Sequence, residues 1–342
     1  MKPRTAAIHA ALLDAVQEHP KDLAAFVANQ FGITRPAILR HIKTLLDAGF
    51  LEATGTTRKT YSLGENRERI RVLSLAGLDE WLVWSRDFAE LVANLPENVG
   101  DIAHRGFTEM LNNAIDHSGG SEVVVGLRIF QGRLEMVIAD DGEGIFHRIT
   151  RLLNLADERL ALLELSKGKL TTDPANHTGE GIFFTSRMFD HFSIRSGNLA
   201  FFHDVELEFD WLDEMPVYKR GTRVAMAISC DSPRSARNVY EEYYAGPEEF
   251  NFNKTVVPMR LARFGNENLV SRSQAKRVTA RFEKFRVVYL DFEGVPEIGQ
   301  GFADELFRVF ANAHPEIELI PVNCPVAVQQ MIVRATSGGA AT

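Results

Sequence analysis

Three polar side chains recur at helical spacing in the segment FTEMLNNAIDHS, which begins at residue 107. If this segment is helical, Glu109, Asn113 and Asp116 fall at positions i, i+4 and i+7 and project from one face. Two carboxylates and one amide on a single stripe are poor core formers, because the burial of unpaired charge is costly. The stripe is therefore the first place in the chain where chemistry is expected.

A glycine-containing turn follows at a short distance. Two alternating runs, SEVVVGLRIF and RLEMVIAD, are joined by Gln131-Gly132 and predict an antiparallel hairpin. The second run ends at Asp140 in the sequence DDGEGI, where Gly142 and Gly144 permit close backbone approach. Taken alone, this sequence is more often a simple turn, and it also invites a calcium interpretation.

Two more segments complete a set of four candidate site motifs. Thr178-Gly179-Glu180-Gly181-Ile182 precedes a predicted helix, and a second segment, residues 219–223 (KRGTR), precedes the apolar run AMAIS. Together, E-x-x-x-N-A-x-D, D-x-G-x-G and these two elements resemble the ATP-binding motifs of the GHKL family. That family includes gyrase, the Hsp-ninety chaperone, histidine kinases and MutL.

The resemblance implies a role for several positions. Glu109 would act as a general base and Asn113 would supply an oxygen to Mg²⁺, an ion that takes few protein ligands beside phosphates and water. Asp140 would accept a hydrogen bond from the adenine amino group, and the Thr222 hydroxyl would lie near the adenine. The expected cofactors are ATP and Mg²⁺, and the expected nucleotide-binding residues are Asn113, Asp116, Asp140, Gly142, Gly144, Thr178, Gly179, Gly181 and Thr222.

The same resemblance identifies the segment from Phe146 to His177 as the ATP lid. Lys167 and Lys169 lie in it, and they either reach the phosphates or, more simply, are solvated loop residues. A histidine kinase is disfavoured, because the nearest candidate phosphoacceptor, His104, is followed by Arg105 rather than by an acid.

The first 64 residues predict a separate small domain. Apolar residues at helical spacing indicate helices at 5–18, 22–31 and 34–48, and the run LEATGTTRKTYSL reads as a hairpin with Gly55 at its centre. This order resembles the winged helix-turn-helix domains of bacterial regulators. The chain carries a formal net charge of -8, yet these residues hold eight Lys or Arg against five Asp or Glu. The resemblance assigns DNA contacts to Arg35, Arg40, His41 and Lys43 in the groove, and to Arg58 and Lys59 on the wing. Protein docking or dimerisation is the alternative role for such a domain.

The C-terminal part alternates predicted strands with helices, which indicates an α/β layer structure. It resembles the STAS-like domain of unknown function. The turn where true STAS factors carry a phosphorylated serine is Glu297-Ile298-Gly299-Gln300-Gly301, which has no hydroxyl. Phosphorylation in cis at that position is therefore not supported, and Ser271 is read as a helix N-cap.

The predicted fold class is multidomain α+β. The domains are a winged helix at 1–64, a helical connector at 65–104, an ATP-binding domain at 105–232 with a largely antiparallel sheet and helices on one face, a STAS-like domain at 245–336 and a tail at 337–342.

With two isolated cysteines and no apolar run long enough for a membrane helix, a cytoplasmic location without membrane association is expected. The predicted function is an ATP-binding, ATP-hydrolysing regulator of transcription. Its expected partners are DNA, an unknown protein bound through the STAS-like domain, and a second copy of the chain. The alternatives are a serine/threonine kinase of the anti-sigma type and a phage-defence component.

Overall fold

The computed structural model describes most of the chain in two compact units. The described residues are 3–56, 58–170, 179–205, 209–246, 249–263 and 267–337. The first unit comprises Met1–Gly142 with Arg223–Pro233, and the second comprises Glu143–Thr222 with Arg234–Thr342. Each unit is described by itself. Within the described residues, no helix combines the length and the apolar character needed to cross a bilayer.

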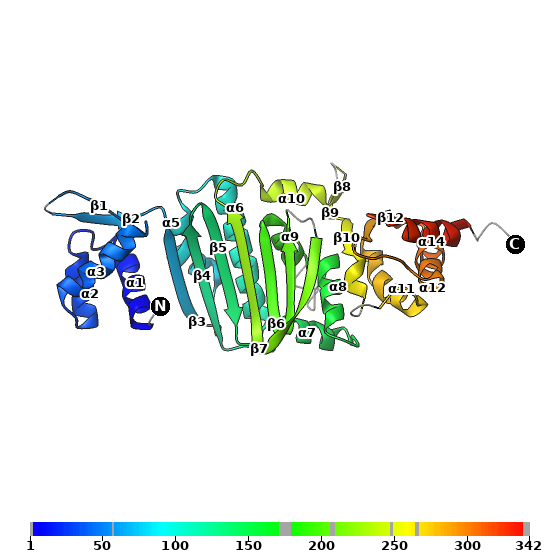
Figure 1. Cartoon of the computed structure of the whole chain (residues 1–342), viewed down its shortest axis with the longest axis horizontal. Coiled ribbons are helices and arrows are strands. Elements are labelled where there is room, and N and C mark those ends of the chain that lie inside the picture. The colour runs from blue at the N-terminus through cyan, green and yellow to red at the C-terminus, as the bar shows by residue number, and fades with distance from the viewer. Residues whose placement is uncertain are drawn as a thin grey trace. The chain divides into compact units, whose positions relative to one another are not determined.

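The first unit begins with three helices and a hairpin, in the predicted order (Figure 1). They are α1 (Pro3–Ala15), α2 (Leu23–Phe31), α3 (Arg35–Asp47), β1 (Leu51–Thr54) and β2 (Thr60–Leu63). Gly32, at φ +61°, ends α2 in the left-handed conformation that favours glycine. The three helices and β1 bury one apolar cluster, which includes Leu12, Val16, Leu23, Val27, Ile38, Ile42, Leu45 and Leu51.

A strand follows where a helical connector is predicted, so the connector prediction is wrong for β3 (Arg67–Ser74). This strand pairs antiparallel with β4 (Glu122–Phe130), from Arg67 opposite Ile129 to Ser74 opposite Glu122. Arginines at alternate positions of β3 lie half-buried, and this polar face hides the alternation that normally marks a strand. The predicted hairpin of β4 and β5 (Arg133–Asp140) is confirmed, with Gln131 and Gly132 in its turn.

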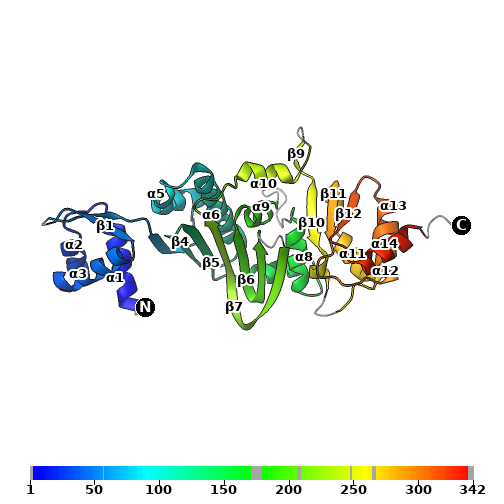
Figure 2. The same cartoon turned by 45° about the horizontal axis from the view of Figure 1, so that its top comes forward.

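Helices cover this part of the sheet (Figure 2). A short helical stretch consists of α4 (Glu80–Val83), the π-helix η1 (Trp84–Phe88) and α5 (Ala89–Val92). After a break at Pro96, the long helix α6 (Glu97–His117) begins. Its buried face packs against the sheet through Val99, Ile102, Ala103, Phe107, Met110, Leu111 and Ala114.

The second unit holds the segments that follow the first glycine turn. They are α7 (Ile145–Leu152), α8 (Arg159–Lys167), α9 (Gly181–Met188), β6 (His191–Asp204) and most of β7 (Phe209–Ser229). The strand order is β3-β4-β5-β7-β6, and β7 contributes to both units because its last residues, from Arg223 onwards, pair with β5. The predicted KRGTR segment therefore lies within β7 rather than before a separate strand.

The rest of the second unit contains the predicted α/β layer, and its three strands pair in parallel in the order β10-β11-β12. These strands are β10 (Lys254–Pro258), β11 (Val287–Asp291) and β12 (Glu318–Val322). The segment before them forms α10 (Ala236–Glu242), β8 (Tyr244–Gly246) and β9 (Glu249–Phe252). The connections contain η2 (Met259–Ala262), α11 (Arg272–Thr279), η3 (Phe282–Lys284), α12 (Gln300–Asp304), η4 (Glu305–Phe310), α13 (Ala311–Ala313) and α14 (Val326–Ser337).

Candidate functional site

The stripe on α6 is formed as the spacing predicts. Glu109 and Asp116 are exposed and Asn113 is half-buried, while the neighbouring residues Met110 and Leu111 are buried in the core. The helix therefore divides into an apolar face toward the sheet and a polar face with the three candidate side chains. Among the described residues, no group of three or more His, Cys, Asp or Glu side chains is placed to hold a metal ion.

Gly142 lies against the C-terminal end of α6. A Cβ atom at this position would sit 2.1 Å from the backbone oxygen of Ser118, far inside van der Waals contact. The preceding turn is closed by Asp140, whose Oδ1 accepts a hydrogen bond from the Gly142 backbone N–H at 2.9 Å. The first glycine turn and the polar helix are thus held together, and glycine is required there by contact rather than by φ.

Asp141 has a role that the sequence analysis missed. Its Oδ1 accepts hydrogen bonds from the backbone N–H groups of Ser121 at 2.7 Å and Glu122 at 3.0 Å, and its Oδ2 accepts one from the Ser121 hydroxyl. These bonds, with that of Glu122 the largest cause, lower the pKa of Asp141 to about 2. Asp141 therefore fastens the glycine turn to the start of β4. The DD doublet was the only signal in the sequence.

In the second unit, the remaining residues of the first glycine turn form their own contacts. Gly144 has φ +92°, and a Cβ there would lie 2.5 Å from the Ser196 hydroxyl, which itself donates to the Gly221 carbonyl at 2.9 Å. The Thr222 hydroxyl oxygen accepts a hydrogen bond from the backbone N–H of Ile145, the first residue of α7, at 3.0 Å. Thr222 thus fixes the helix that begins directly after the glycine turn.

The second glycine element begins α9. Gly179 has φ +74° and is followed, two residues on, by Gly181 as the first residue of the helix. Between them, burial raises the pKa of the Glu180 carboxyl, and the charge of Lys169 opposes that shift. Thr178 lies outside the described residues.

Both interpretations are wrong for Lys167, whereas a phosphate contact of Lys169 stays a prediction. Lys167 is fully buried and paired with Glu164, with its Nζ 2.7 Å from Glu164 Oε1. Lys169 is half-buried, and its Nζ donates to the Lys284 carbonyl at 2.9 Å. Partners more than a hundred residues further along the chain hold both side chains, which local sequence reading does not detect.

The predicted groove-facing residues lie on α3. Arg35, Arg40 and Lys43 are exposed, as a nucleic-acid contact requires. His41 is half-buried instead, and its Nδ1 lies 3.2 Å from Nε2 of His9 on α1. His41 therefore contacts α1 within the helical domain, and its contact with DNA stays a prediction.

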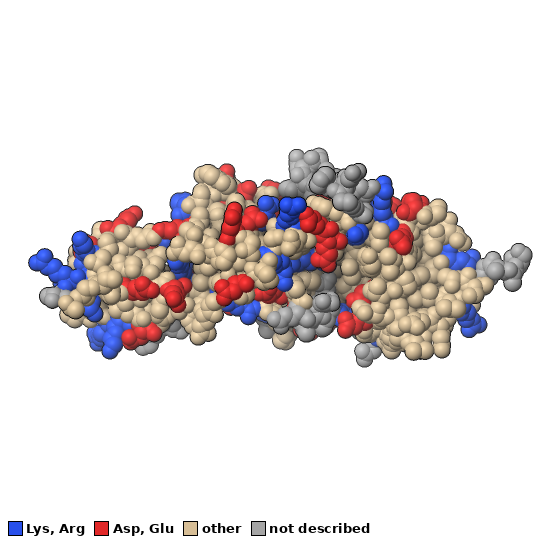
Figure 3. All heavy atoms as spheres, turned by 90° about the horizontal axis from the view of Figure 1, so that it is seen from above, with Lys and Arg blue, Asp and Glu red and all other residues tan. Residues whose placement is uncertain are grey.

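The tip of the β1–β2 hairpin adds further positive charge. Arg58 and Lys59 are both exposed between the two strands, where a wing would meet phosphates. Figure 3 shows Lys and Arg side chains gathered over this N-terminal domain. The structure thus brings the predicted cations, apart from His41, to the surface of one small domain.

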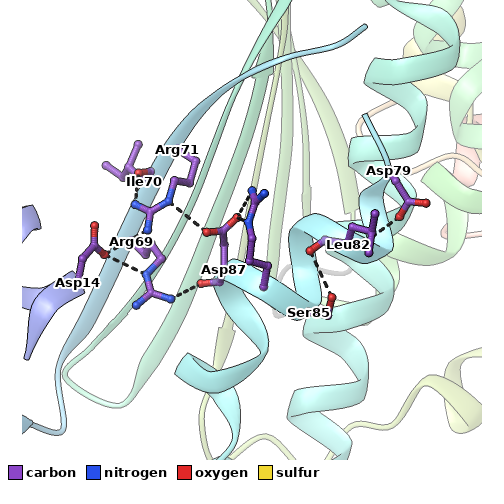
Figure 4. Close-up of polar contacts among 9 residues, drawn as sticks. Asp14, Arg69, Ile70, Arg71, Asp79, Leu82, Ser85 and Asp87 are labelled. Atoms are coloured by element: carbon purple, nitrogen blue, oxygen red, sulfur yellow. Dashed lines mark hydrogen bonds and ion pairs between the residues drawn. The ribbon is translucent and has the colours of Figure 1, made fainter. Parts of the chain in front are cut away.

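A polar network joins α1 to β3 and η1 (Figure 4). Asp14 Oδ1 accepts hydrogen bonds from Arg69 Nε and Arg71 Nη2, both at 3.2 Å. Behind them, Arg69 donates to the carbonyl of Asp87, and Arg71 Nε lies 3.3 Å from the Asp87 carboxylate. Arg86 adds a further ion pair to Asp87 at 2.6 Å. The helical domain is thus tied to the edge strand of the sheet by charge-assisted hydrogen bonds.

Comparison with known families agrees with this architecture. Residues 74–200 match the model of the histidine kinase-like ATPase domain, and residues 274–329 match the STAS-like domain of unknown function. The chain therefore contains a GHKL-type ATPase domain, which binds ATP in this family, followed by a STAS-like domain.

Comparisons with individual proteins add little. A search of curated proteins finds no match. Among solved structures, an IcIR transcriptional regulator from Alicyclobacillus acidocaldarius is 16% identical, with 71% of this chain and 96% of that chain covered. The TM-score of this match is 0.19.

Proposed function

We propose that this chain is an ATP-binding and ATP-hydrolysing regulator in which the nucleotide state controls DNA binding by the N-terminal domain. The observation that carries the coupling is the network of Asp14, Arg69, Arg71 and Asp87, because it joins α1 to the edge strand of the sheet that continues into the ATPase domain. A nucleotide-dependent change in β3 alters the position or stability of α1, the helix that supports the domain with the exposed cations of α3 and of the hairpin tip.

The residues present fit ATP and Mg²⁺. The polar face of α6 offers one amide and two carboxylates, and Mg²⁺ needs few protein oxygens when phosphates and water complete its shell. Asn113 would hold the ion, Asp140 the adenine, and the glycines at 179 and 181 the phosphates. Bound Mg²⁺ would neutralise phosphate charge during transfer. Glu109, exposed on the same face, would accept the proton of the attacking water.

Nucleotide binding and turnover test the ATPase half of the proposal. We expect Asp140→Asn and Asn113→Ala to lose ATP binding, whereas Glu109→Ala binds ATP but does not turn it over. Glu135→Gln is the matched control, because Glu135 is exposed on the same strand as Asp140. Unchanged hydrolysis in Glu109→Ala would remove Glu109 as the base. Transfer of label from γ-labelled ATP to a STAS-domain protein, instead of release of free phosphate, would favour the kinase alternative.

DNA affinity tests the coupling. We expect wild-type protein to bind DNA with affinities that differ by about fivefold or more between ATP, ADP and no nucleotide, the low end of typical allosteric coupling. Asp14→Asn should reduce this difference while ATP affinity stays at the wild-type value. Equal DNA affinity and equal oligomeric state in all three conditions would refute the proposed function.

A further inference from the structure

The end of α8 contains charged side chains that are buried against the STAS-like domain. Lys167 is fully buried, and besides its pairing with Glu164 its Nζ donates to the carbonyls of Arg277 at 3.3 Å and Ala280 at 3.0 Å. The Thr255 hydroxyl of β10 donates to the Lys167 carbonyl at 2.7 Å. Burial lowers the pKa of Lys167, and the Glu164 carboxylate opposes that shift. All of these residues belong to the second unit.

Arg281 completes this ion cluster from the STAS-like side. Its Nη1 lies 2.6 Å from Glu164 Oε2, and its Nη2 donates to the Gly168 carbonyl at 2.7 Å. Arg281 has φ +67°, in the left-handed region that disfavours residues with a Cβ. Such a conformation persists where surrounding contacts over-determine it, and here three polar contacts to α8 and its end do so.

The same segment leads directly to the second glycine element. Lys169 and Lys284 each donate from Nζ to the other's carbonyl, at 2.9 and 3.3 Å. The next residue, Leu170, donates its backbone N–H to the Gly179 carbonyl at 3.0 Å, and a Cβ on Gly179 would lie 2.4 Å from the Leu170 carbonyl carbon. Lys169, which the STAS-like domain holds, is therefore directly adjacent to Leu170, which positions the second glycine element.

An aromatic cluster makes a second connection. Phe183 of α9 packs on Phe252 of β9 with ring centroids 4.5 Å apart, and Phe252 packs on Phe285 at 5.4 Å. Gly168 fits between these rings, since a Cβ there would lie 2.7 Å from Phe252 and 2.9 Å from Phe183. The helix that begins at the glycine element is thus packed, through one ring, onto the STAS-like domain.

We propose that the STAS-like domain is the regulatory input of the nucleotide site, and that the cluster of Glu164, Lys167 and Arg281 transmits its state to the second glycine element. The inference rests on the proposed function insofar as the ligand is ATP. A buried ion cluster suits this role because its charges are balanced only when all partners are present. Loss of one partner leaves a buried charge uncompensated. By linkage, nucleotide binding must act on the STAS-like domain to the same extent as that domain acts on nucleotide binding.

The test uses the full chain with Arg281→Gly, which removes the guanidinium yet tolerates the positive φ. We expect a rise of about tenfold in the Kd for ATP. Hydrogen exchange should become faster at residues 164–170 and 179–184 without nucleotide. In wild type, ATP should slow exchange at residues 274–290, and this effect should be absent in Arg281→Gly. Lys276→Met is the matched control, because Lys276 lies on the preceding helix, α11, outside the ion cluster, and its side chain is 70% exposed.

A second variant guards against simple unfolding. Lys284 is exposed, so Lys284→Met is expected to keep the melting temperature of wild type while it shows a smaller change in the same direction. Wild-type ATP affinity and wild-type exchange in both variants would overturn the inference and leave the proposed function standing. Absence of ATP binding in wild type would instead refute the proposed function, and the exchange measured without nucleotide would still decide whether the cluster holds the glycine element.

Discussion

Gly142 gives the sharpest prediction about the candidate site. Its φ is open to any residue, so Gly142→Ala adds only one methyl group, placed 2.1 Å from the Ser118 oxygen and 2.7 Å from the Ser118 carbonyl carbon. Ordinary contact begins near 3.4 Å, so the glycine turn must move away from α6 by roughly 1 Å. Overpacking of this kind costs about 1–3 kcal/mol of unfolding free energy.

The displacement also separates Asp140 from the polar face of α6. Because a misplacement of about 1 Å can cost two orders of magnitude in function, we expect ATP affinity to fall by at least about tenfold. Urea unfolding and a fluorescent ATP analogue measure the two effects. The matched control is Gly100→Ala in α6, where a Cβ meets nothing within 4 Å and should stabilise the helix by about 0.5–1 kcal/mol. Wild-type stability and ATP affinity in Gly142→Ala would refute the reasoning.

Three further substitutions test other parts of the chain. Asp141→Ala should lower the unfolding free energy at about pH 5. The difference from wild type should shrink as the pH falls from 3.8 toward about 2, because only the ionised carboxylate of Asp141 stabilises the fold. Unfolding at several pH values checks this. Asp87→Asn should destabilise by about 1–3 kcal/mol, since Asp87 is buried and bound by Arg71 and Arg86; an unchanged denaturation midpoint would contradict it. Arg40→Ala should weaken DNA binding and reduce the slope of log affinity against log salt by about 1, and a salt titration with the same slope as wild type would exclude a phosphate contact.

The residues with local spacing could be predicted from the sequence. The stripe of Glu109, Asn113 and Asp116 follows from spacing along one helix, and the glycine turn follows from its glycines; the contact of Gly142 with Ser118 depends on the fold. The alternating elements of the STAS-like domain and the N-cap at Ser271 were predictable for the same reason. The roles of the nucleotide-binding residues stay predictions.

Two of the errors share one physical cause, which is charge that is paired by residues far away in the chain. In β3, Arg69 and Arg71 occupy the positions where a strand normally shows apolar residues, because Asp14 and Asp87 neutralise them. Lys167 looked solvated because the carbonyls of Arg277 and Ala280, which accept from its Nζ, lie more than a hundred residues further along the chain. Hydrophobic periodicity detects burial of apolar side chains only.

The two ion clusters differ in a way that bears on regulation. Arg71 and Asp14 keep 27% and 38% of their side-chain surface exposed, so their attraction is screened by salt and contributes little to stability. Glu164 and Lys167 are 6% and 0% exposed, so salt screens them far less, and removal of one partner is costly. The link to the N-terminal helical domain is therefore the one suited to reversible adjustment, because its cost of breaking is small. The link to the STAS-like domain is suited to an all-or-none response, since an incomplete cluster leaves a charge in the core.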